Sequence, residues 1–123
     1  MNLAIFLSAI ATIESGNNDL ATGKAGEVSR YQITPLVWRA YAKRGESPIV
    51  ASDAAKVAER FITAEILPAL QRRGKPQTVK AVAACWNYGP KAAYTSWPAK
   101  VTDYAERVAV VYEIHMRRDT DAK

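Results

Sequence analysis

Residues 3–16 read LAIFLSAIATIESG, and this stretch decides the fold. Its first eleven residues are apolar on almost every face of a helix, and a helix of that kind belongs in the middle of a core. Asn2 can cap its start, and Ser15-Gly16-Asn17 is typical of its end. Glu14 comes in the last turn, where the helix dipole disfavours a carboxylate. We therefore predict a buried first helix that ends on an unusually placed glutamate.

The rest of the chain has the pattern of helices joined by short loops. We expect helices over about residues 34–45, 52–74, 78–86 and 102–118, and a short helical turn at 91–95. Pro68 should kink or restart the second of these. Residues 20–33 have no helical period, so we expect a loop with at most a short extended piece at Tyr31-Gln32-Ile33. The prediction is an all-α fold, α+β at most by that piece, in a single domain over residues 1–123.

The composition gives a basic surplus but no cysteine or histidine cluster. Seventeen Lys and Arg against twelve Asp and Glu leave a net charge of +5, which suits an anionic polymer. The basic residues are scattered and form no stripe with interleaved aromatics, so we expect no nucleic-acid partner. Cys85 and His115 are the only residues of their types. This excludes an intrachain disulfide and a cysteine-based metal site, and we expect neither a metal nor a cofactor.

Four short segments carry the candidate chemistry. They are Glu14-Ser15, the stretch Gly26 to Gln32 that ends in Ser29-Arg30-Tyr31-Gln32, the corner Ala84 to Pro90 that reads ACWNYGP, and Tyr104 followed by Arg107-Val108. In order and approximate spacing they resemble the motifs of the lysozyme-like superfamily, the lytic transglycosylases and goose-type lysozymes. The resemblance covers about residues 3–112. It implies a helical domain with a buried central helix, a glycan-binding cleft and cleavage of peptidoglycan glycan strands.

The resemblance implies a role for each residue of these segments. Glu14 would be the catalytic acid, because a glycosidase needs a carboxyl with a raised pKa to protonate the leaving oxygen, and burial raises that pKa. Tyr104 can hydrogen-bond the Glu14 carboxyl, or it is a core tyrosine. The expected substrate contacts are Ser15, Arg30, Tyr31, Gln32, Asn87, Tyr88 and Tyr104.

Several of these residues could instead have an ordinary structural role. Gln32 can equally be a structural glutamine, and Asn87 a plain helix cap. Among the aromatic residues, Trp86 is expected to pack inside, whereas Tyr88 is the better candidate for a sugar contact. Trp97 is a further stacking candidate.

The choice of reaction depends on a second carboxylate. Ordinary glycoside hydrolases use two carboxyl groups across the cleft. The candidates here are Asp19, Glu27, Asp53 and Asp103, and none lies at a motif position. A single glutamate favours a lytic transglycosylase, in which Glu14 serves first as acid and then as base and the product is a 1,6-anhydro-N-acetylmuramic acid end. A hydrolytic muramidase and a non-catalytic glycan-binding or virion module are the alternatives.

Two departures from the family pattern bear on this assignment. Ser29-Arg30-Tyr31 replaces a Gly-Leu-Met-like stretch, and Arg30 would depress the pKa of Glu14 if it pointed at that carboxyl. We expect it to point instead at a substrate carboxylate, which suits its guanidinium fork. Trp86 replaces a tyrosine, and so removes a hydroxyl.

The start of the chain is apolar without resembling an export signal. It lacks a basic leading segment, and its apolar run stops at Ile13, too short to span a bilayer. Together with the small size and basic charge, this favours a monomeric, phage- or prophage-encoded protein that acts at the bacterial cell wall.

Overall fold

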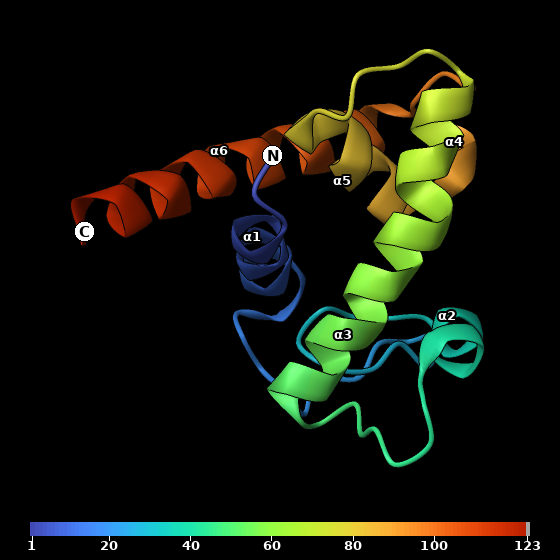
Figure 1. Ribbon diagram of the computed structural model, residues 1–123, viewed down its shortest axis with the longest axis vertical. Helices are drawn as coiled ribbons and strands as arrows, with labels where there is room; N and C mark the ends of the chain where they lie inside the picture. Colours follow the sequence, from blue (N-terminus) through green and yellow to red (C-terminus); the bar gives the residue numbers. More distant parts are fainter. Residues whose placement is uncertain (123) are drawn as a thin grey trace.

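Helices make up most of residues 1–122, the part of the chain that the computed structural model describes (Figure 1). The elements are α1 (Leu3–Ser15), α2 (Pro35–Tyr41), α3 (Ala51–Phe61), a π-helical turn η1 (Ile62–Ile66), α4 (Leu67–Arg72), α5 (Val79–Tyr88), a 3₁₀ turn η2 (Pro90–Ala93) and α6 (Ala99–Asp121). Extended pairing within residues 1–122 amounts to two isolated antiparallel bridges, Thr22 to Val28 and Val28 to Ile33. The predicted helical class is confirmed.

The first helix forms as its end signals predict. The Asn2 side chain accepts a hydrogen bond from the backbone N–H of Ile5, and Gly16 adopts the left-handed conformation that closes the helix, with φ 64°. Six residues of α1 are buried, including Phe6 and Ile10. Ala4 and Ser8 are exposed, so one face of the helix reaches solvent.

The helix starts predicted near residues 34 and 78 are confirmed. The hydroxyls of Thr34 and Thr78 accept hydrogen bonds from the third residue of α2 and of α5. Helix α3 begins at Ala51, one residue before the expected start, and the Asp53 carboxylate in its first turn accepts a hydrogen bond from the backbone N–H of Ser47. Helix α6 likewise begins after Pro98, several residues before the expected start.

Helix α2 is shorter than predicted and α5 is longer. An ion pair between Arg60 and Glu46 (2.6 Å), together with the N–H of Lys43 that donates to the same Glu46 carboxylate, closes a turn where we expected α2 to continue to Gly45. Helix α5 continues to Tyr88 because Gly89, at φ 96°, supplies the terminating conformation.

A long curved rod forms one side of the molecule. In Figure 1 the helices α3 and α4 run into each other through η1. The sequence places Pro68 inside this rod, where it lacks the N–H that a helix needs and crowds the preceding turn. The widened turn of η1 directly before it, in which Leu67 N–H donates to the Ile62 carbonyl, lets the rod pass the proline without ending.

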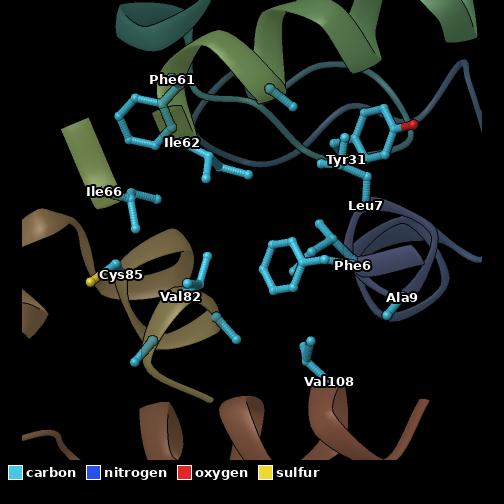
Figure 2. Close-up of a cluster of buried hydrophobic side chains, with 14 of the residues drawn as sticks. Phe6, Leu7, Ala9, Tyr31, Phe61, Ile62, Ile66, Val82, Cys85 and Val108 are labelled. Carbon is cyan, nitrogen blue, oxygen red and sulfur yellow. The ribbon is translucent and has the colours of Figure 1, made fainter. Parts of the chain in front are cut away.

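The core lies where α1, the rod, α5 and α6 meet. Figure 2 shows Phe6 of α1 between Val82 of α5 and Val108 of α6, with Ile62 of η1 on another side. Phe6, Ile62, Val82 and Val108 are fully buried. Cys85 is buried in the same cluster, as its apolar neighbours predict. Within residues 1–122 no helix has the length and apolarity to cross a membrane.

The buried face of α1 is predicted to dominate stability. Ile10 is fully buried, so Ile10→Ala should lower the free energy of unfolding by about 2–5 kcal/mol through lost burial and the cavity left behind. Ile49→Ala is the matched control, because Ile49 is 57% exposed, and it should cost less than about 1 kcal/mol. Urea denaturation measures both. Equal losses in the two variants would contradict the placement of α1 in the core.

Candidate active site

Glu14 lies at the end of α1, facing α6. The Tyr104 hydroxyl donates a hydrogen bond of 2.7 Å to its Oε2 atom, across 90 residues of sequence. Tyr104 is 5% exposed, so its ring belongs to the core while its hydroxyl serves the carboxyl. Tyr104 is therefore both a core tyrosine and a hydrogen-bond donor to Glu14, the two roles that the sequence suggested.

Burial raises the pKa of the Glu14 carboxyl above its usual value of 4.5. The Tyr104 hydroxyl opposes this rise, because it stabilises the charged form, and the carboxylate of Glu27 adds to it by repulsion. Trp86 and Arg107 lower the pKa by smaller amounts. Since burial outweighs the donors, Glu14 holds its proton to a higher pH than an ordinary glutamate, as a general acid must.

Trp86 connects the carboxyl of Glu14 to a neighbouring pocket. The indole N–H, the only donor that the Trp86 side chain has, lowers the pKa of Glu14. Its ring meets Phe61 edge-on at 5.9 Å between centroids. Trp86 is partly buried and packs against the core, as expected.

Glu27 is the one carboxylate among the four sequence candidates that acts on the pKa of Glu14. The other three are engaged elsewhere: Asp19 with Arg30, Asp53 with Ser47, and Asp103 with Arg107. The backbone N–H of Ala25 donates to Glu27 Oε1 (3.0 Å). Its Oε2 atom lies 2.1 Å from where a Cβ on Gly23 would be, so Gly23 makes room for the carboxylate.

Ser15 and Gln32 hold the loop beside Glu14 together. The Ser15 hydroxyl donates to the Arg30 carbonyl (2.8 Å) and accepts from the N–H of Asn18. The Gln32 amide donates to the carbonyls of Ala21 and Ser29. Gln32 itself has φ 53° and Ser29 has φ 76°, conformations that cost energy in residues other than glycine and gather at functional sites. The structural role foreseen for Gln32 is therefore present.

The Arg30 side chain has a partner within the chain. Its guanidinium forms a two-pronged ion pair with Asp19, at 2.7 and 3.0 Å, and the pair lowers the pKa of the Asp19 carboxyl. It has no part in the pKa shift of Glu14. The structure therefore shows the Arg30 guanidinium paired with an acidic side chain of the same chain, and a contact with a substrate carboxylate stays a prediction.

Tyr31 also differs from the sequence expectation. Its ring is 6% exposed and belongs to the buried cluster that holds Leu7, and Figure 2 shows it there. A sugar ring cannot stack on a face that the core already covers. Burial raises the pKa of its hydroxyl.

A pocket of about 390 Å³ has Trp86 in its wall and brings several predicted residues together. Gln32, Asn87 and Tyr88 line it, and Tyr41 and Glu65, joined by a hydrogen bond, form part of its wall. Asn87 is exposed within the last turn of α5, so it is a helical residue and not the cap. Trp86 lines this pocket as well. Glu14 is not among the lining residues, and the indole of Trp86 links the two.

Comparison of the chain with protein-family models, with curated proteins and with solved structures found no match. Within residues 1–122 no group of three or more histidine, cysteine or acidic side chains is placed to hold a metal ion. Glu14 and its neighbours are therefore the groups that can carry chemistry at this site.

The hydrogen bond from Tyr104 should limit the pKa rise at Glu14. Tyr104→Phe removes a donor that favours the charged carboxylate, so the pKa of Glu14 should rise further. Tyr112→Phe is the control, because its hydroxyl, also on α6, bonds the backbone of Asn2. A carbon-13 NMR titration of the glutamate carboxyls measures both. An unchanged or lower pKa in Tyr104→Phe would refute the role given to this hydroxyl.

Proposed function

We propose that the protein cleaves the glycan strand of bacterial peptidoglycan at the β-1,4 bond between N-acetylmuramic acid and N-acetylglucosamine, with Glu14 as the general acid. The observation that carries the proposal is a partly buried carboxyl with a raised pKa, held by a tyrosine hydroxyl next to a pocket. It is supported by the meeting, around this carboxyl, of all four segments that resemble the lysozyme-like motifs.

The orientation of Glu14 suits proton donation. Tyr104 donates to Oε2, so the acidic proton of the neutral form belongs on Oε1. Protonation of the glycosidic oxygen by that atom would let the bond to C1 of the muramic acid break. The Tyr88 ring and the exposed amide of Asn87 provide the kind of stacking surface and hydrogen-bonding group that sugar recognition uses.

The proposed second step returns a proton to Glu14. If the protein is a lytic transglycosylase, the ionised Glu14 accepts the proton of the muramic acid C6 hydroxyl while that oxygen forms a bond to C1. The product is a 1,6-anhydro ring, and no water is consumed. Substrate groups thus replace a second carboxylate, as in the known exceptions to the two-carboxylate scheme.

One observation favours hydrolysis as a second candidate. Glu27 is close enough to Glu14 to raise its pKa, and a fixed N–H and a glycine hold it in place. A carboxylate in such a position could activate a water as general base. The products would then carry reducing ends.

The role of Glu14 as acid is tested by Glu14→Gln. The amide cannot supply a proton, so release of soluble sugars from purified peptidoglycan should fall by at least about a hundredfold. The circular dichroism spectrum and Tm should show an intact fold. Glu113→Gln, an exposed glutamate on α6, is the control and should keep full activity. Full activity of Glu14→Gln would rule out the proposal, and wall binding by the wild type without sugar release would favour a non-catalytic module.

The choice between the two reactions is tested by the product ends. We expect anhydro-muramyl ends, one water lighter than reducing ends by mass spectrometry, in the wild type and also in Glu27→Gln. Reducing ends that incorporate oxygen-18 from labelled water, and that are lost in Glu27→Gln, would show hydrolysis with Glu27 as base.

A further inference from the structure

A larger cavity lies apart from the pocket that Trp86 lines. It has a volume of about 780 Å³ and shares no lining residue with that pocket. Its walls come from the end of α4, the start of α5, η2 and the segment that leads into α6. Of the candidate site residues named above, Trp97 is the one that lines it.

The cavity is positively charged and carries no compensating acid. Arg73 and Lys75 line it, and of the described residues in its wall none is acidic. Neither cation takes part in the ion pairs found within residues 1–122. Two cations without a partner in one concave surface attract an anion.

Arg73 is held in place without losing its charge. Its guanidinium lies over the Tyr94 ring, 4.4 Å from the centroid. Pairing with a carboxylate, as in Arg30 and Asp19, would have neutralised the cation. An aromatic ring restricts the side chain and leaves its hydrogen-bond donors available to an anion.

The rest of the wall offers groups that suit a sugar. Tyr94 is 56% exposed, and the Trp97 ring is fixed by a hydrogen bond from its indole N–H to the Ala92 carbonyl (2.8 Å). The side-chain hydroxyls of Ser96 and Thr102 line the cavity and have no hydrogen-bond partner within residues 1–122. Aromatic surface and hydroxyls in a space of this size fit a ring-bearing ligand, whereas a bare inorganic anion would leave most of it empty.

We infer that this cavity is a second binding site, for a saccharide that carries a carboxylate. The carboxylate meets Arg73 and Lys75, and the sugar ring lies toward Tyr94, Trp97 and the hydroxyls. The site does not depend on Glu14 being catalytic, because it uses none of the residues around that carboxyl.

The first test compares two sugars that differ by one carboxylate. N-acetylmuramic acid carries a lactyl carboxylate that N-acetylglucosamine lacks, and each is titrated into the nitrogen-15-labelled protein. N-acetylmuramic acid should shift the amides of Thr95 and Ser96 and the indole of Trp97, with N-acetylglucosamine at least about tenfold weaker. Binding beside Glu14 moves the Trp86 indole instead, so the two sites are read separately.

The second test uses variants of the cavity to show whether binding depends on Arg73 and Lys75 and on the Tyr94 ring that holds Arg73. Arg73→Gln combined with Lys75→Gln should weaken N-acetylmuramic acid by about tenfold or more. Arg72→Gln is the matched control, since Arg72 is a neighbouring cation outside the lining. Tyr94→Phe should bind like the wild type and Tyr94→Leu more weakly, because only the phenylalanine ring keeps Arg73 in place.

Four results would overturn the inference. They are equal shifts from both sugars, no shift of the cavity resonances on the order of tens of millimolar, an equal loss in Arg72→Gln, and shifts from inorganic phosphate as large as those from N-acetylmuramic acid. The last would show a site for simple anions and not for an acidic sugar.

Discussion

The hydrogen bond between Tyr104 and Glu14 is the contact on which the site depends. It joins the last turn of α1 to α6, two helices that pack through the core but lie 90 residues apart in sequence at this point. The bond fixes one oxygen of the Glu14 carboxyl, and burial of the group raises its pKa. A carboxyl at the C-terminal end of a helix is unfavourable to stability. The position of Glu14 at the edge of the core is therefore more easily understood as a chemical requirement than as a structural one.

Side-chain hydrogen bonds and an ion pair hold the loop from Ala21 to Ile33 beside this contact. Ser15, Gln32 and the pair of Arg30 with Asp19 all tie the loop to itself or to the end of α1. Residues predicted to meet substrate are therefore occupied within the chain, and the groups that remain available come from the end of α5. Ser29 and Gln32 in this loop have positive φ values, a conformation that costs energy in residues other than glycine.

Sequence reasoning succeeded where structure is local. The helical class and the cap at Asn2 followed from patterns of apolar and capping residues, whereas the hydrogen bond of Tyr104 to Glu14, 90 residues away, was suggested by the family resemblance alone. Sequence reasoning failed where a side chain could choose between partners distant in space. Arg30 forms an ion pair with Asp19, and the Asp53 carboxylate accepts a hydrogen bond from the backbone N–H of Ser47. The proximity of Glu27 to Glu14 depends on loop conformations that no periodic pattern encodes.

The central claim is that the neutral carboxyl of Glu14 donates a proton, and one comparison on the wild-type protein tests it most directly. The pKa of Glu14 is measured by carbon-13 NMR, and the pH dependence of kcat/KM is measured on purified peptidoglycan. The account predicts a pKa above the usual 4.5 and an alkaline fall in kcat/KM at that same pH. A pKa at or below 4.5, or activity that continues unchanged well above the measured pKa, would contradict it.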